Sequence, residues 1–312
     1  MRQEGVGKLD RIVGQWMSDM GCMAQSKAVY YRTLLVWNRW MITERHYNVM
    51  GATRSDIEAY RDWLIRSGKS PHTICNYLAV VRMFCRYLHR TCAKSEDISS
   101  GIRGVKRRKF FNKRPLTDDQ VVDLFGCLDL STKAGIRDRL ILSLMVRAGL
   151  RCCEVSRIDV GDFITVSGTP ALRLQRKGHI AKDMTIPVAD DVMDALRDYL
   201  LVRQPRTGEP LLTSYHRRLH GSVYRINADT VKKIVTNRLR RAGITGDGIS
   251  AHSLRHTFGC MMVSAGVPLD QVQVLMGHNS IDSTSIYVKM AADRELFASN
   301  PANRVKIGRK VL

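Results

Sequence analysis

The protein has 312 residues, more than one typical domain, so two domains are expected. A composition of 44% hydrophobic and 25% charged residues excludes wholesale disorder. The 50 Lys and Arg exceed the 29 Asp and Glu, and the resulting net charge of +21 favours nucleic acid as the partner. No apolar run reaches the ~18 residues of a membrane span, so no membrane partner is expected.

The first third of the chain has a helical pattern. Apolar residues recur at three- and four-residue spacings over 25–46, and the pattern resumes after two helix-start signals. These signals are a capping box made by Ser55 with Glu58 and a cap followed by proline, Ser70 with Pro71. The sequence therefore predicts a small all-helical unit of about four helices.

A densely basic segment follows this unit. Residues 103–114, RGVKRRKFFNKR, contain seven basic residues and no acid. Such a run repels itself unless phosphates neutralise it. Residues 1–116 hold 22 Lys and Arg against 9 Asp and Glu, so +13 of the +21 lies there. We interpret 104–116 as a basic linker that joins the helical domain, 1–103, to a second domain.

The second domain, 117–290, is predicted to be mainly helical with one small antiparallel sheet. Thr117 and Gln120 make a capping box at its start, and Gly168 and Gly178 mark turns between short strands. The predicted helices are 135–148, 189–202, 227–242, 252–265, 269–276 and 282–290, and the predicted strands are 163–166, 171–176 and 183–187.

Six side chains of the second domain form a candidate chemical site. His252 and Arg255 are three residues apart, so both project from one helix face. His278 and Tyr287 are nine apart with a helix start between them, which brings the tyrosine near the histidine. The full set is Arg151, Lys177, His252, Arg255, His278 and Tyr287.

These residue types suit the chemistry of a phosphodiester. Arginine forks match phosphate oxygens, histidines add donors, and fixed donors stabilise the charge that develops under attack. Tyr287 is the candidate nucleophile, and its pKa, about 10 when free, implies that nearby cations help it to ionise. Lys177 is a candidate proton donor to the leaving oxygen. No metal or other cofactor is expected, because the arginines supply the positive charge.

Each residue taken alone has an ordinary structural explanation. Arg151 follows a helix end, where arginines commonly lie at the surface, and a lysine in a turn is by default solvated. Tyr287 has the spacing of a half-buried core residue, and His252 alone is more often structural than catalytic. It is the joint order and spacing of the six that predict a site.

The two arginine segments resemble motifs of the tyrosine recombinase, or phage integrase, family. AGLRCCE at 148–154 resembles the first arginine motif, with Glu154 as the supporting acid three residues after Arg151. HSLRHT at 252–257 resembles the second. The resemblance implies that both arginines bind the scissile phosphate.

Two further segments carry the same resemblance. RKGHIAK at 176–182 resembles the β-turn that bears the family's catalytic lysine, which we assign to Lys177, with Lys182 as the competing choice. LMGH at 275–278, followed by Tyr287, resembles the box that ends in the nucleophile.

The resemblance implies a fold and a mechanism. The expected fold is an N-terminal helical, SAM-like core-binding domain followed by a mainly helical catalytic domain. The expected enzyme is a metal- and ATP-independent site-specific DNA recombinase. It would act through a 3′-phosphotyrosyl intermediate and a Holliday junction, in integration or excision of a mobile element or in dimer resolution. A homodimer would occupy each double-stranded DNA site and a homotetramer the synaptic complex, with the tail 291–312 docking on a neighbouring protomer.

Two alternatives use the same residues differently. One is a catalytically inactive DNA-binding or architectural protein, and the other is a type IB topoisomerase-like enzyme. Every catalytic position is filled, which disfavours the first, and the compact helical first domain disfavours the second.

Basic residues in two predicted helices and in the linker are the candidate DNA contacts, most of them to backbone phosphates. They are Arg82, Arg86, Arg90, Lys106, Arg107, Arg108, Lys109, Lys113, Arg114, Lys232, Lys233, Arg238, Arg240 and Arg241.

The eight cysteines are scattered and lack paired CxxC spacing. Adjacent Cys152 and Cys153 make a poor zinc pair, since both would have to turn toward one ion. The pattern predicts reduced thiols in a cytoplasmic protein, without a metal site.

Overall fold

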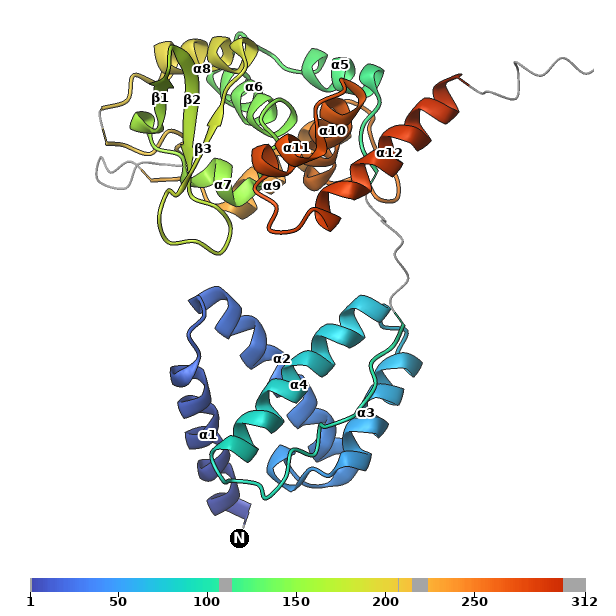
Figure 1. The fold of residues 1–312 in the computed structure, drawn as a ribbon. Coiled ribbons are helices and arrows are strands. Elements are labelled where there is room, and N and C mark those ends of the chain that lie inside the picture. Colours follow the sequence, from blue (N-terminus) through green and yellow to red (C-terminus); the bar gives the residue numbers. More distant parts are fainter. Residues whose placement is uncertain (1, 107–113, 207, 215–223, 300–312) are drawn as a thin grey trace, which may run out of the picture. The chain divides into compact units, whose positions relative to one another are not determined.

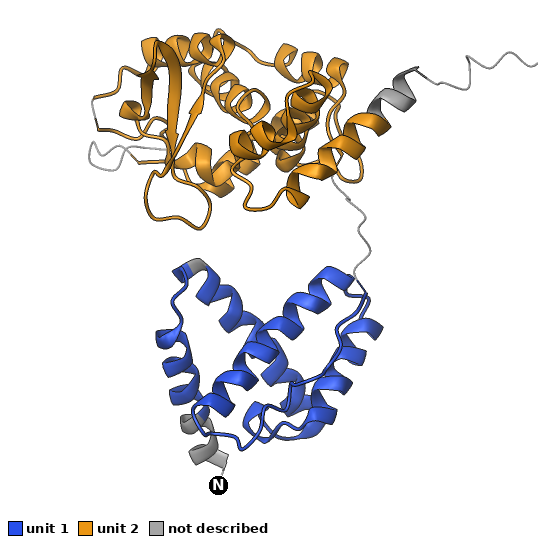
Figure 2. Ribbon diagram, viewed as in Figure 1, with its two compact units in different colours: residues 1–110 blue, residues 111–312 orange. Residues whose placement is uncertain are grey.

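The structure is a computed structural model that describes residues 2–106, 114–206, 208–214 and 224–299 (Figure 1). It divides into two compact units, Met1–Phe110 and Phe111–Leu312 (Figure 2). Among the described residues, no helix combines the length and apolarity that crossing a membrane requires.

Unit 1 is entirely helical in its described part. Its elements are α1 (Arg2–Asp19), α2 (Ala24–Arg45), the short 3-10 helix Val49–Gly51, α3 (Arg54–Arg66) and α4 (Pro71–Arg90). The Ser70 side chain caps α4 and Pro71 is its first residue, as predicted. The predicted start of α3 is wrong by two residues: Thr53 and Asp56 form the capping box. Asp56 takes this role because it is buried and also accepts a hydrogen bond from the Tyr47 hydroxyl.

Aromatic rings fill the core of unit 1. Trp40 and Trp63 both lie against Tyr60, with ring centroids 5.1 and 5.8 Å away, so α2 and α3 share one cluster. Trp16 of α1 meets Phe84 of α4 edge to face at 5.0 Å. These large rings supply much of the apolar area that a four-helix unit must bury.

Unit 2 is mainly helical with one small sheet, which confirms the predicted fold class. Figure 1 shows the sheet beside α8, and α10, α11 and α12 grouped away from it. The elements are α5 (Asp118–Gly126), α6 (Lys133–Val146), α7 (Cys152–Arg157), the 3-10 helix Val160–Asp162, β1 (Phe163–Val166), β2 (Thr169–Leu174), β3 (Met184–Pro187), α8 (Asp190–Arg203), α9 (Ala228–Arg241), α10 (Ala251–Ser264), α11 (Leu269–Met276) and α12 (Asp282–Ser299).

The sheet is antiparallel in the order β1-β2-β3. Phe163 pairs with Leu172, and Leu172 pairs with Ile186. The two predicted turn glycines both adopt positive φ, +81° at Gly168 and +92° at Gly178, a conformation that glycine reaches without strain. The second turn, between β2 and β3, is the longer one and carries Lys177.

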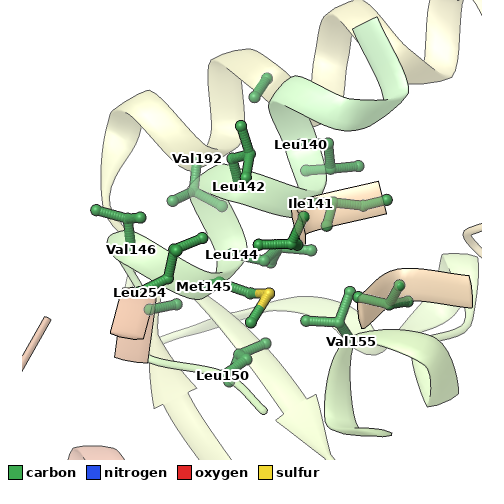
Figure 3. Packing of buried hydrophobic residues seen from close by; sticks show 14 of the residues in the cluster. Leu140, Ile141, Leu142, Leu144, Met145, Val146, Leu150, Val155, Val192 and Leu254 are labelled. Atoms are coloured by element: carbon green, nitrogen blue, oxygen red, sulfur yellow. The ribbon is translucent and has the colours of Figure 1, made fainter. Parts of the chain in front are cut away.

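Helix α6 is the centre of the unit 2 core (Figure 3). Every residue from Leu140 to Val146 is buried, because neighbouring elements cover the helix on all sides. Its apolar side chains pack with Val155 of α7, Val192 of α8 and Leu254 of α10. The core thereby fixes α7 and α10, the two elements on which the candidate arginines lie.

The last helix is longer than the predicted 282–290. Helix α12 does not stop at residue 290 but continues to Ser299, so the predicted boundary between 117–290 and 291–312 falls inside a helix. The basic end of the predicted tail lies outside the described residues, as do Arg107, Arg108, Lys109 and Lys113 of the linker.

Candidate active site

Arg151 stands at the entry to α7 and is held there by Glu154. The Glu154 carboxylate is buried and accepts hydrogen bonds from the Arg151 backbone N–H (2.8 Å) and from its Nη1 (2.7 Å). The chain reaches this position through Gly149, which has φ +67° and where a Cβ would lie 2.4 Å from a carbon of the Phe258 ring. Only glycine fits this turn, so the local fold fixes where the arginine begins.

Arg255 is buried within α10, with 2% of its surface exposed. Its Nη1 donates to the Gly149 carbonyl (2.6 Å), and its Nη2 donates to the Met276 carbonyl at the end of α11. Glu154 lies 3.8 Å from Nη1, so one carboxylate stands between two guanidinium groups. Burial and the charge of Arg151 lower the pKa of Arg255 to about 10, which still leaves it charged at neutral pH.

His278 follows the glycine that ends α11. Gly277 has φ +58° and caps the helix, as the sequence predicted. The His278 Nδ1 lies 2.9 Å from the Thr284 hydroxyl, which leaves Nε2 as the nitrogen free to meet a substrate oxygen. Burial, then the charges of Arg255 and Arg151, lower the pKa of His278 to about 4, so the ring is neutral at pH 7.

Tyr287 lies on α12 and is buried against α10. Its ring stacks on His278, and a Cβ at Gly259 would lie 2.7 Å from the ring's Cε1, so glycine makes room for it. Burial raises the pKa of Tyr287 to about 12, while the charges of Arg255 and Arg151 act to lower it. The two cations act in the direction that the sequence predicted, but burial outweighs them.

His252 reaches the tyrosine through a residue that the sequence analysis overlooked. His252 is exposed on the first turn of α10, and its ring meets His256 edge to face with centroids 4.7 Å apart. His256 is buried and lies 5.6 Å from the Tyr287 ring. Helical spacing held the signal, since His256 is four residues after His252 and next to Arg255.

The two candidate lysines differ in their surroundings. Lys177 is exposed at the tip of the β2–β3 turn and forms no ion pair with any described carboxylate. Lys182 is held by Asp159 (2.6 Å) and by Asp162, which is buried. Lys182 is thus held within the fold by two carboxylates, whereas no described carboxylate neutralises the charge of Lys177.

The site brings five of the six predicted side chains into one group, namely Arg151, Arg255, His278 and Tyr287, with His252 at its edge acting electrostatically on His278. The β2–β3 segment borders this group: Arg176 and Asp183 line a hollow of about 370 Å³ together with His278 and Gln273. Within the described ranges, no cluster of His, Cys, Asp and Glu has the form of a metal site.

The candidate DNA contacts fall into two sets. Most of those described have exposed side chains, and these are Arg86, Arg90, Lys106, Arg114, Lys232, Lys233, Arg240 and Arg241. Two do not fit a simple phosphate contact. Arg238 is mostly buried and pairs with buried Asp138 at 2.6 Å, so its charge is already engaged within the fold, and its contact with DNA stays a prediction. Arg82 is half-buried and donates to the Ile102 carbonyl at 2.7 Å.

Comparison with known proteins identifies the family. The model of the phage integrase family matches residues 114–294, which include all six candidate residues. The chain belongs to the phage integrase family. This phage integrase family member is 31% identical to tyrosine recombinase XerC of Corynebacterium glutamicum over 283 residues, covering 86% of this chain and 88% of that one. It is 28% identical to tyrosine recombinase XerD of Xanthomonas axonopodis pv. citri over 301 residues, covering 93% and 95%.

Solved structures share the fold of this integrase family member. A lambda integrase dimer bound to a COC′ core site superposes with a TM-score of 0.69 at 17% identity, covering 89% of this chain and 93% of that one. XerH bound to a palindromic difH substrate, in a post-cleavage complex, gives 0.64 at 20% identity, covering 81% and 73%. Together with the family match, these findings confirm the prediction of a tyrosine-type site-specific DNA recombinase and disfavour the two alternatives.

Proposed function

We propose that this recombinase exchanges DNA strands through a 3′-phosphotyrosyl intermediate, with Tyr287 as the nucleophile. The observation that carries the proposal is the position of its ring. The ring centroid lies 6.1 Å from that of His278, and the charges of Arg255 and Arg151 both act on the hydroxyl. A phenol beside two guanidinium forks is suited to attack a phosphate that those forks hold.

The first step transfers the phosphate from a DNA oxygen to the tyrosine. The Tyr287 Oη loses its proton to solvent and attacks phosphorus, the bond to the 5′ oxygen breaks, and that oxygen takes a proton from Lys177, so a 3′-phosphotyrosine and a 5′-hydroxyl result. Arg151 and Arg255 donate to the non-bridging oxygens, where negative charge develops. His278 is neutral because its pKa is lowered to about 4, so it contributes a hydrogen bond rather than a charge.

The second step reverses the first with a different strand. A 5′-hydroxyl from the partner DNA attacks the phosphotyrosine and reforms a phosphodiester, so the bond energy is kept and no ATP is consumed. After one pair of strands has been exchanged, the two duplexes are joined in a Holliday junction. Exchange of the second pair of strands resolves this junction. The arginines carry the positive charge at the phosphate throughout, so the steps use no metal ion.

Lys177 is the proposed proton donor to the leaving 5′ oxygen. An alkoxide is a poor leaving group, and an ammonium that protonates it lowers the barrier. The exposure of Lys177 supports this choice, because its charge is free to approach DNA. Lys182 is the weaker choice, since Asp159 and Asp162 already hold its ammonium.

The DNA complex follows from the charge of the chain and from its relatives. We propose that the helical domain 1–103 and the catalytic domain both bind the duplex, with the linker 104–116 on the phosphates. A dimer occupies each site and a tetramer forms the synapse, with 291–312 contacting a neighbour. The lambda integrase dimer on a core site, and its tetramer on a Holliday junction, support this assembly. A cytoplasmic location accords with DNA as the substrate.

The test maps covalent adducts on DNA. The protein is incubated with random-library duplexes that carry nicks, which trap the intermediate because the cut strand diffuses away. Adducts are then captured under denaturing conditions, and the recovered DNA is sequenced to give the target. Tyr287→Phe must lose the adduct on that target while its DNA binding, measured by gel shift, is unchanged.

A matched control removes a different phenol. Tyr224 lies in the same unit and is exposed, so Tyr224→Phe should cleave at the wild-type rate. An adduct that persists in Tyr287→Phe would overturn the assignment of the nucleophile.

A further inference from the structure

Three polar side chains close the β2–β3 turn that carries Lys177. The Asp183 carboxylate accepts hydrogen bonds from Arg176 at both oxygens, from Nη2 at 3.1 Å and from Nε at 3.3 Å. The His179 Nδ1 lies 2.5 Å from the same carboxylate. We call Arg176, His179 and Asp183 the clasp. It joins the segment that follows β2 to the residue that precedes β3.

Main-chain contacts tighten the turn from within. The Arg176 carbonyl accepts from the His179 N–H at 3.1 Å and from the Arg157 Nη1 at 3.2 Å. The Gln175 side chain donates to the His179 carbonyl at 2.8 Å. Gly178 adopts φ +92°, the conformation that so tight a reversal requires. The lysine therefore lies on a short loop closed on both sides.

The clasp also touches the elements that carry the rest of the site. Arg157 is the last residue of α7, the helix that Arg151 precedes. A Cβ on Gly277 would lie 3.2 Å from the Arg176 Cδ, so Arg176 packs against the residue before His278. The turn is thus fixed to two of the elements that present candidate phosphate-binding side chains, α7 and the loop after α11.

We infer that the clasp is a positioning device that holds Lys177 in register with Arg151 and His278. The inference rests on the proposed role of Lys177 as the acid. Lys177 and Gly178 are both exposed, so the position of the loop depends on the contacts at its base, and the clasp supplies the side-chain contacts that join its two ends. A catalytic group displaced by about 1 Å can lose about 100-fold in rate. The clasp residues themselves touch no reacting atom.

The charge state of the clasp suits this task. Hydrogen bonds from Arg176, and then from His179, lower the pKa of Asp183, although burial opposes them. The carboxylate is therefore ionised at neutral pH and accepts from both partners. Asp183→Asn keeps the shape of the side chain but removes this charge, so it loosens the clasp with little change in volume.

The experiment separates positioning from folding by changing the leaving group. Cleavage is measured on the DNA site recovered by adduct mapping, made once with an ordinary phosphodiester and once with a 5′-bridging phosphorothioate. A thiolate leaves without protonation, so the phosphorothioate bypasses the acid. Asp183→Asn should cleave the ordinary site about 10- to 100-fold more slowly and the phosphorothioate within about threefold of wild type. Lys177→Ala should show the same rescue.

A control variant tests whether losing any exposed carboxylate slows cleavage, and a second clasp variant is used if the first does not fold. Asp191→Asn removes an exposed carboxylate that pairs with Arg147 at 2.6 Å, and it should cleave both substrates as wild type does. His179→Gln serves if Asp183→Asn loses its helical circular dichroism, and the same rescue is expected of it.

The outcomes divide cleanly. The clasp inference is overturned if the tested variant slows both substrates equally, or slows neither, while Lys177→Ala is rescued. If Lys177→Ala itself is not rescued, the proposed acid is wrong, and the clasp falls with it.

Discussion

The rings of Tyr287 and His278 lie nearly parallel, with centroids 6.1 Å apart and planes inclined by 13°. The two residues come from different elements, α12 and the loop after α11, so their contact ties the proposed nucleophile to a candidate phosphate-binding residue. The tyrosine ring also packs against Gly259 of α10, the helix of Arg255. A displacement of α12 therefore changes the position of the proposed nucleophile relative to the arginines.

Gly259→Ala tests this packing. The added methyl would lie 2.7 to 2.8 Å from three carbons of the Tyr287 ring, so the ring must shift. Overpacking of this kind costs about 1–3 kcal/mol, and we expect adduct formation to fall with the free energy of unfolding. Gly126→Ala is the control, because a Cβ there meets nothing within 4 Å. Cleavage by Gly259→Ala at the wild-type rate would show that the Tyr287 ring can occupy another position and still react.

Glu154→Ala tests the carboxylate shared by the two arginines. Its removal leaves Arg151 and buried Arg255 without the charge that separates them, and breaking a buried pair typically costs about 3–5 kcal/mol. Glu154→Gln keeps an acceptor and should lose less. Urea unfolding measures the effect, and Asp198→Ala, which removes an exposed partner of Arg139, should cost less than about 1 kcal/mol. A Glu154→Ala protein as stable as that control would contradict the prediction.

His278→Gln should make the free energy of unfolding depend less steeply on pH below about pH 6.5. In the folded protein burial lowers the pKa of His278 to about 4, against 6.5 when the ring is exposed. Between these values the unfolded chain binds a proton that the folded chain does not, so the free energy of unfolding falls as the pH is lowered. The glutamine variant lacks this proton and should lose stability less steeply from pH 6.5 toward pH 4.

The readout for this pH series must follow unit 2. All four tryptophans, Trp16, Trp37, Trp40 and Trp63, lie in unit 1, so their fluorescence follows that unit alone. Far-UV circular dichroism follows both units, and the transition without a fluorescence counterpart belongs to unit 2. If the two proteins give parallel profiles in that transition, the histidine is not held neutral by the fold.

The sequence predicted most long helices because their signals are local. Thr117 with Gln120 and Ser70 with Pro71 start helices where the patterns placed them. Helix α7 was missed because its six residues are too few to show periodicity. The start of α3 was misplaced because buried Asp56 also accepts a hydrogen bond from the Tyr47 hydroxyl. Tyr47 lies outside the helix, so the local pattern does not reveal this contact.

The residues of the site also differ in whether local sequence could reveal them. Its six candidates followed from motifs, whereas the residues that support them depend on contacts across the fold. Gly259 and His256 gain meaning only once α12 brings the tyrosine ring onto α10. Arg176 gained no role from its motif, because its packing on Gly277 joins segments about 100 residues apart.

The pairing of Arg238 gives the last prediction. Arg238 and Arg240 lie on the same helix, α9, yet Arg238 pairs with buried Asp138, a partner 100 residues away, while Arg240 is exposed. Arg238→Ala should lower the free energy of unfolding by about 1–3 kcal/mol, because the buried carboxylate loses one of its two arginine partners and keeps Arg137 at 2.7 Å. Its binding to random-sequence duplex should keep the wild-type dependence on salt.

Arg240→Ala should behave in the opposite way. Losing one phosphate contact should reduce the slope of log affinity against log salt by about 0.9 and leave stability within about 0.5 kcal/mol of wild type. Fluorescence anisotropy at several salt concentrations gives the slope, and urea unfolding gives the stability. If Arg238→Ala instead flattened the salt dependence at unchanged stability, its pairing with Asp138 would not hold in solution, and Arg238 would be a DNA contact as the sequence predicted.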